Sequence, residues 1–193
     1  MLHRLYSWTM GLAGHRHALL WLAALTCAES VFFPIPPDAL IIPMVLAARH
    51  HAWRIAGVAT MTSVAGGLMG YGIGYFLFEE LGKPIIEFYG YTDKYQTFQG
   101  WYREYGAWIV AAGGFTPIPY KVVAIATGVV QLDVLTFIVV STLSRGARFY
   151  ITAALLWRFG EPIRNFIEAR LALLATLFFV MLFLGFILLG YLT

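Results

Sequence analysis

Charged residues are scarce in this sequence. Aspartate, glutamate, lysine and arginine make up only 12% of its 193 residues, whereas 60% are hydrophobic. A water-soluble globule of this size needs much more polar surface. The composition therefore excludes an ordinary soluble domain and favours a chain embedded in a lipid bilayer.

Other features are also missing. The single cysteine, Cys27, cannot form an intrachain disulfide. The formal net charge is only +3, and the basic residues are scattered between apolar blocks, so nucleic acid is not an expected partner. No HExxH, GxSxG or paired His–Asp motif lies in an apolar segment, which argues against an intramembrane enzyme, and neither a metal nor a cofactor is predicted. No A-x-A site follows the first apolar stretch, so we expect it to be retained.

What the sequence has instead is long apolar segments. The stretches 55–78 and 171–192 each supply the twenty or so uncharged residues that span about 30 Å of hydrocarbon. A third stretch, 134–157, is equally long but contains Arg145 and Arg148. We predict that all three cross the membrane.

Two proline-rich segments interrupt the apolar sequence, 33-FPIPPDALIIP-43 and 116-TPIPYKVVAIA-126. About eleven residues follow Asp38 before the next charge, which is about 16 Å of helix, or half a bilayer. A backbone broken by proline is tolerated in hydrocarbon only where protein or a wet cavity shields it. We therefore predict re-entrant hairpins over 18–48 and 107–132. Their turns are predicted at Pro34, Pro36, Pro37, Pro117 and Pro119.

A hairpin followed by one spanning helix thus occurs twice, at 18–78 and at 107–157. A unit with an odd number of crossings reappears upside down, so the predicted fold is an all-α integral membrane protein built as an inverted repeat. An interfacial helix over 1–17, a connector over 79–106, and a cytoplasmic loop with one extra transmembrane helix over 158–193 complete it. The alternative is two ordinary kinked spanning helices in each half.

Basic residues near the predicted spans set the orientation, because cytoplasmic loops carry an excess of lysine and arginine. The N-terminus is expected inside, and the connector and the C-terminus outside. The basic residues of the expected inner face are Arg4, Arg16, Arg49, Arg54, Arg158, Arg164 and Arg170.

Several charges are expected near the middle of the bilayer. Asp38 and Lys121 follow the two proline turns, and Arg145 is halfway along its helix. A charge at that depth costs about 2.5–3.5 kcal/mol unless it is paired or wetted, which predicts a polar cavity. As equivalent positions of an inverted repeat, Asp38 and Lys121 are expected to face each other. A polar stripe recurs at helical spacing over Ser141, Ser144, Arg145, Arg148 and Thr152.

These residues indicate an anion site. Two arginines three positions apart, with Lys121 and Ser144, favour a phosphate, and a phosphate reached from within the membrane suggests a lipid headgroup. Glu29 and Asp38 are candidates for proton uptake, since a poorly hydrated carboxylate is more readily protonated. The alternative is that the acids only neutralise the basic residues. A second stripe, predicted to pack helices closely, runs through Ala59, Ser63, Gly66, Gly70 and Gly74.

Four of these elements together resemble the DedA family, also called the SNARE-associated or VTT-domain family. They are Glu29 with 34-PIPPD-38, the turn 113-GGFTPIPYK-121, the glycine of 126-ATG-128, and the helix segment 141-STLSRGARFY-150. The likeness is greatest to the YqaA-like branch. It covers about residues 18–157.

The resemblance implies a multi-pass protein of the bacterial inner membrane that translocates polyprenyl phosphate carriers or scrambles phospholipids, with proton coupling. By position, Glu29 and Asp38 match the family's acidic pair, and Lys121 matches an arginine. The earlier arginine of the family's turn is missing from 115-FTPIP-119. The expected function is a translocase for undecaprenyl phosphate or a phospholipid, and the alternative is a proton-coupled antiporter of small ions. A homo-oligomer is left open.

Overall fold

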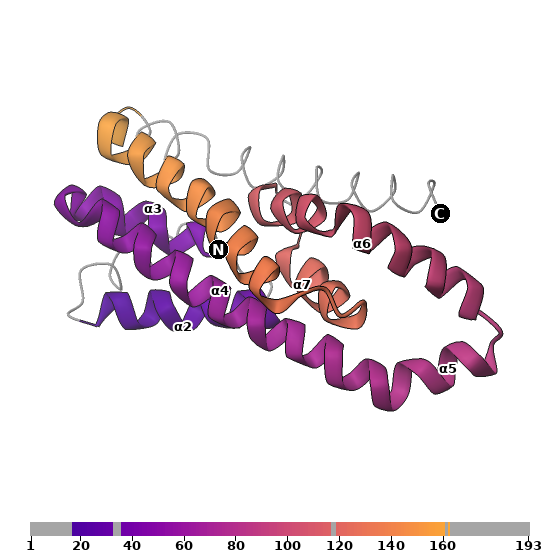
Figure 1. Cartoon of the computed structure of the whole chain (residues 1–193). Helices are drawn as coiled ribbons and strands as arrows, with labels where there is room; N and C mark the ends of the chain where they lie inside the picture. Colours follow the sequence, from indigo (N-terminus) through magenta and orange to yellow (C-terminus); the bar gives the residue numbers. More distant parts are fainter. Residues whose placement is uncertain (1–16, 33–35, 117–118, 161, 163–193) are drawn as a thin grey trace.

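The computed structural model describes residues 17–32, 36–116, 119–160 and 162, which form helices and turns with no strand among them (Figure 1). The elements are α2 (Ala18–Val31), α3 (Asp38–Ala47), a short 3-10 helix (Arg49–His51), α4 (Ala52–Leu77), a π-helical turn (Phe78–Gly82), α5 (Lys83–Phe88), α6 (Thr92–Phe115), α7 (Tyr120–Val129) and a final helix, Val134–Gly160.

Two of the predicted spanning segments are single unbroken helices, namely α4 over the expected 55–78 and Val134–Gly160 over the expected 134–157. In the described part of the chain, only Val134–Gly160 is both long and apolar enough to cross a membrane by length and composition. That α4, with its many glycines, also crosses stays a prediction. The predicted helix 171–192 and the interfacial segment before residue 17 lie outside the described residues.

The expected first hairpin corresponds to the short apolar helices α2 and α3, which flank the proline-rich segment. In the second half, α6 and α7 flank 116-TPIP-119. Here α6 is longer than the sequence suggested, because it begins at Thr92 and runs without a break through residue 107, where the second repeat was expected to start. Polar and aromatic residues of the expected connector therefore belong to the same helix as the arm of the hairpin. The inverted repeat itself stays a prediction.

The prolines that precede α3 and α7 lie where a helix accepts them. Pro37 immediately precedes α3, and its carbonyl accepts hydrogen bonds from the amides of Leu40 and Ile41, each at 3.0 Å. Pro119 precedes α7 in the same way, and its carbonyl accepts the Val122 amide at 3.0 Å. Proline has no amide hydrogen, and the start of a helix needs none. Pro36 lies before α3 and Pro43 lies inside it, whereas Pro34 and Pro117 fall outside the described residues.

Helix α4 is the centre of the bundle, and α2 and α7 pack against it. The predicted small-residue stripe makes this possible. A Cβ at Gly66 would meet the backbone carbonyl of Cys27 in α2, and one at Gly74 would meet the carbonyl of Ile125 in α7. The prediction that these glycines let helices approach closely is confirmed.

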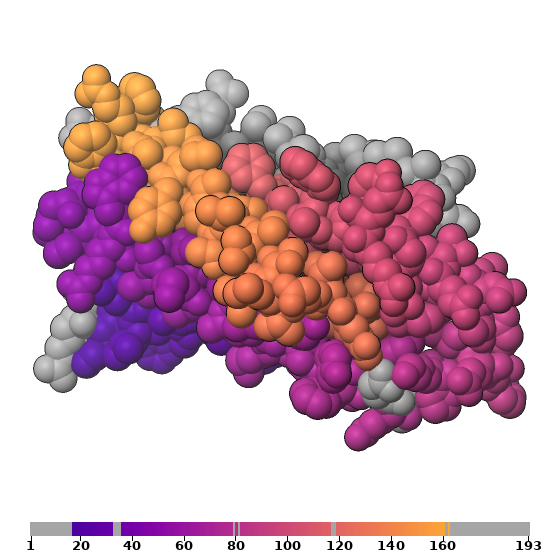
Figure 2. Space-filling model, viewed as in Figure 1, coloured from indigo at the N-terminus to yellow at the C-terminus, as the bar shows by residue number. Residues whose placement is uncertain are grey.

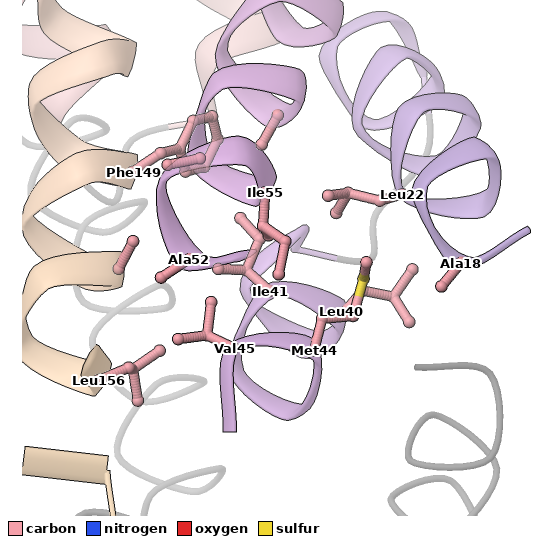
Figure 3. Packing of buried hydrophobic residues seen from close by; sticks show 13 residues of the cluster. Ala18, Leu22, Leu40, Ile41, Met44, Val45, Ala52, Ile55, Phe149 and Leu156 are labelled. Carbon is pink, nitrogen blue, oxygen red and sulfur yellow. The ribbon is translucent and has the colours of Figure 1, made fainter. Parts of the chain in front are cut away.

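Buried apolar side chains form two cores, one toward each end of the bundle. The first joins α2, α3 and the start of α4 to the last turns of the Val134–Gly160 helix, and Figure 3 shows Ile41, Val45 and Phe149 within it. The second joins α6, α7, the C-terminal half of α4 and the start of the final helix, around Tyr120 and Phe137. The final helix contributes to both cores, and in the space-filling view its side chains form a band across the visible face (Figure 2). Arg145 lies between the residues that it contributes to the two cores, Phe137 and Phe149, and so does Arg148.

The start of the final helix is fixed by Asp133. Its Oδ2 accepts hydrogen bonds from the Thr136 amide at 2.7 Å and from the Thr136 hydroxyl at 2.9 Å. These bonds stabilise the ionised carboxylate, so they hold the pKa of Asp133 below its ordinary value. The cap fixes where the helix begins, and therefore the turns of the helix on which Arg145 and Arg148 lie.

Candidate functional site

Two arginines of the final helix, Arg145 and Arg148, reach other helices of the bundle. Arg145 donates from Nε to the Ser63 hydroxyl at 2.7 Å, and from Nη2 to Glu29 Oε2 at 3.1 Å. One side chain thus joins α2, α4 and the final helix. Only 3% of the Arg145 side chain and 16% of the Glu29 side chain are exposed, so this ion pair is largely shielded from solvent.

Aromatic rings enclose the same guanidinium. Its central carbon lies 4.8 Å from the ring centre of Tyr120 and 4.7 Å from that of Phe149. Cation–π attraction is strongest where water is excluded, as it is here. Arg145 is therefore held by a carboxylate, a hydroxyl and two ring faces.

Hydroxyl groups extend this network into α2. Ser30 and Ser63 share a hydrogen bond of 2.9 Å between their hydroxyls, and Ser30 also lies 3.4 Å from Glu29 Oε2. Ser30 and Ser63 are fully buried. The buried acid and the buried base thus share polar neighbours, which compensates for their removal from water.

The second ion pair is more open. Arg148 donates from Nη2 to Asp38 Oδ2 at 2.8 Å, and from Nη1 to the carbonyl of Thr116 at 3.1 Å. A quarter of each charged side chain is exposed, 24% for Arg148 and 25% for Asp38. Arg148 therefore joins the start of α3 to the turn before α7, and solvent reaches the pair.

Lys121 links the two halves of the chain. Its Nζ is 3.4 Å from the carbonyl of Phe32, at the end of α2, and can donate to it. Phe32 and Lys121 are 89 residues apart, so the contact brings the end of α2 against the start of α7. In this arrangement Asp38 pairs with Arg148, and that Asp38 and Lys121 face each other stays a prediction.

The rest of the predicted polar stripe is less accessible. Ser144 is buried, and a Cβ at Gly114 of α6 would meet its hydroxyl. Ser141 is also buried, and its hydroxyl has no hydrogen-bond partner among the described atoms. Thr152 donates to the Arg148 carbonyl of its own helix at 3.0 Å. The stripe is real, but only part of it faces solvent.

The charges are paired with one another, as the alternative interpretation of the sequence expected. Both carboxylates, Glu29 and Asp38, bind an arginine of the final helix. An arginine–carboxylate pair of this kind can exchange its carboxylate for an anionic ligand where solvent reaches it. A cavity of about 210 Å³ lies away from both pairs, between α6 and the turn 130–133, beside Gln99 and Arg103.

Sequence reasoning missed the aromatic part of the site. Tyr120 and Phe149 are each next to a predicted site residue in the chain, but their ring faces on Arg145 have no sequence signature. Ser63 was assigned to the packing stripe, where it also lies in the structure. Ser63 could have been identified as a polar site residue, because it is a serine in a glycine-rich stripe at the same predicted membrane depth as a charge in another helix.

Comparisons with other proteins identify the family of the chain. A model of the VTT domain matches residues 35–158. A protein of Haemophilus influenzae is 35% identical over 168 residues, which is 85% of this chain and 87% of the relative. A protein of Histophilus somni is 40% identical over the same length and the same shares. Both relatives are named only as uncharacterised proteins, and no solved structure matches the chain. The match covers the second proline turn and the first one from residue 35 onward, together with Asp38, Arg145 and Arg148, whereas Glu29 lies before it. The chain belongs to the VTT-domain, or DedA, family of membrane proteins.

Proposed function

We propose that this protein moves a phosphate-bearing lipid between the two leaflets of a bacterial inner membrane. The most suitable substrates are undecaprenyl phosphate and a phospholipid headgroup. The observation that carries the proposal is the partly exposed Arg148–Asp38 pair, which joins the start of α3 to Thr116 at the end of α6 within an apolar helical bundle.

The chemistry of the pair suits a phosphate. A guanidinium binds two oxygens of a phosphate at once, as it binds a carboxylate. The Asp38 carboxylate then occupies the position that an arriving phosphate would take on Arg148. Lys121, beside the same turns, offers a second positive charge. We assign phosphate binding to Arg148 and Lys121, with Arg145 and Ser144 behind them.

The same exchange couples binding to protons. A phosphate that displaces Asp38 from Arg148 leaves the carboxylate without its counter-ion and beside a second negative charge. Such a group takes up a proton more readily. Glu29 is the second candidate for proton uptake, although its pairing with the buried Arg145 makes it harder to release.

The test is transport in vesicles that contain the purified full-length protein and a fluorescent phospholipid, or a labelled polyprenyl phosphate, in both leaflets. A membrane-impermeant quencher removes the signal of the outer leaflet only. With active protein nearly all the signal is lost, whereas in protein-free vesicles about half is protected. Arg148→Met should slow the loss at least tenfold, because it removes the phosphate ligand. Arg103→Met, which removes an exposed arginine of α6, is the matched control and should leave the rate unchanged.

The alternative is a proton-coupled antiporter of small ions. It is favoured by the two carboxylates, Glu29 and Asp38, at the predicted midplane. The same vesicles, loaded with a pH-sensitive dye, distinguish the two activities. Protons that move in response to a Na⁺ or K⁺ gradient, without loss of labelled lipid, would replace the lipid proposal with the antiporter.

A further inference from the structure

The two ends of the molecule differ in charge. At the end where α4 begins and the final helix ends, residues 39–60 and 150–160 contain no aspartate or glutamate. These elements lie together at one end of the bundle, opposite α5 (Figure 1). The basic and histidine residues of this end are Arg49, His50, His51, Arg54 and Arg158. The residues that follow in sequence, 161–170, contain two glutamates and two arginines, so they add no net charge.

Exposed aromatic rings lie among these charges. The Trp53 ring, at the start of α4, is stacked 6.1 Å from the Tyr150 ring and lies 6.2 Å from the Trp157 ring of the final helix. Their exposed fractions are 46% for Trp53, 42% for Tyr150 and 48% for Trp157. Aromatic residues of two helices therefore form one surface.

Basic residues lie beside these rings. A Cβ at Gly160 would meet the Arg49 guanidinium, so the start of the 3-10 helix touches the end of the final helix. Arg54 in α4 and Arg158 in the final helix directly follow Trp53 and Trp157 in the chain, and both are exposed. The Arg158 guanidinium also lies 5.9 Å from the ring centre of Phe159, which is half exposed.

The opposite end provides an internal comparison. It also exposes aromatic residues, including Phe88, Trp101 and Trp108. Its charges are different, because acidic residues outnumber basic ones over residues 79–104. The acids there are Glu79, Glu80, Glu87, Asp93 and Glu104, against Lys83, Lys94 and Arg103. Aromatic exposure is thus common to both ends, and an excess of positive charge is found at one.

We propose that the surface formed by Trp53, Tyr150 and Trp157 with Arg54 and Arg158 binds the headgroups of anionic phospholipids in the leaflet that it faces. Tryptophan and tyrosine rings prefer the depth of the headgroups. Each basic side chain near an anionic membrane surface strengthens binding by about fivefold. This lipid surface is separate from the Arg148–Asp38 site, and the inference does not rest on lipid translocation.

Charge also decides between the possible occupants. A second copy of the chain related by a twofold axis would place like charges of Arg54 and Arg158 opposite one another, which is unfavourable. A zwitterionic lipid would satisfy the rings but leave the excess positive charge unmatched. An anionic lipid satisfies both features.

The experiment uses the purified full-length protein in neutral detergent micelles, titrated with phosphatidylglycerol or phosphatidylcholine. The number and affinity of bound lipids are measured by native mass spectrometry. The wild type should bind phosphatidylglycerol more tightly. The double variant Arg54→Gln/Arg158→Gln should weaken that binding about twentyfold and leave phosphatidylcholine binding unchanged. Both side chains are exposed, so the fold should be retained.

The matched control is Lys94→Gln/Arg103→Gln, which removes the same charge from two exposed residues of the opposite end. It should retain the wild-type affinity for phosphatidylglycerol. Equal losses in the two double variants would show that net charge alone attracts the lipid, and would overturn the proposal. Unchanged binding in Arg54→Gln/Arg158→Gln would overturn it as well. Trp53→Leu adds an independent measurement, since it should weaken binding of both lipids by losing the interfacial ring.

Discussion

Two arginine–carboxylate pairs, three residues apart on one helix, are in different environments. The Arg145 side chain is 3% exposed and is enclosed by Tyr120 and Phe149, whereas Arg148 is 24% exposed and has a partner, Asp38, that is equally open. Their donors, acceptors and distances are similar. The difference lies in what surrounds them.

This difference assigns the pairs separate roles. A buried ion pair gains little net stability over apolar residues, but the loss of one partner strands the other without water. An exposed pair exchanges its partner more easily, since solvent or a ligand can replace either group. We infer that Arg145–Glu29 holds the bundle together and that Arg148–Asp38 is where a ligand enters.

The largest expected effect comes from breaking the buried pair. Arg145→Met leaves Glu29 without a partner and should lower the free energy of unfolding by about 3–5 kcal/mol. Arg148→Met should lower it by only about 1 kcal/mol, because solvent reaches Asp38. Thermal unfolding in detergent, followed by tryptophan fluorescence, measures both.

A rescue experiment controls for general damage. Replacing both buried partners, as Arg145→Met/Glu29→Gln, removes the stranded charge and should recover much of the lost stability. If Arg148→Met unfolded at a lower temperature than Arg145→Met, the assignment of roles would be reversed.

The second prediction concerns the exposed pair. Arg148→Lys keeps the positive charge but loses the planar fork that binds two oxygens, so lipid transport should fall about tenfold while the unfolding temperature stays near that of the wild type. The vesicle assay and the unfolding assay together test this. Transport at the wild-type rate would mean that Arg148 is only a counter-ion of Asp38.

The third prediction tests proton coupling. Asp38→Asn mimics the protonated acid, so it should still bind the phosphate lipid but lose the pH dependence of transport between about pH 5.5 and 8.5. Lys121→Met should instead weaken lipid binding at every pH in that range. An Asn variant that keeps the wild-type pH profile would remove Asp38 from the coupling mechanism and leave Glu29 as the remaining candidate.

The sequence predicted the parts of this comparison that depend on local pattern. Proline placed both turns, and the run of small residues from Ala59 to Gly74 placed the close helix contacts, because a residue with little or no side chain lets another backbone approach. The expected depth of Asp38, Lys121 and Arg145 also put them at one level. Depth alone leaves the rotation of each helix open, so it did not select Arg148 as the partner of Asp38.

The length of α6 shows a second limit. Residues 92–106 are polar and aromatic, and that composition suggested a connector outside the membrane. The composition of a segment indicates whether it prefers water or lipid. Helix formation depends instead on backbone hydrogen bonds, which can form in both environments. One helix therefore extends from the expected connector into the expected hairpin.

The smallest expected effect separates the ring of Tyr120 from its hydroxyl. The hydroxyl is buried beside that of Ser141 without forming a hydrogen bond of good geometry, whereas the ring covers the Arg145 guanidinium. Tyr120→Phe should therefore change the unfolding temperature and lipid transport little, because it removes no more than a weak contact with Ser141. Tyr120→Leu removes the ring face and should lower the free energy of unfolding by about 2 kcal/mol, the value for a desolvated cation–π contact. If Tyr120→Phe were as destabilising as Tyr120→Leu, the hydroxyl would be part of the buried network, and the aromatic enclosure would no longer explain why Arg145 differs from Arg148.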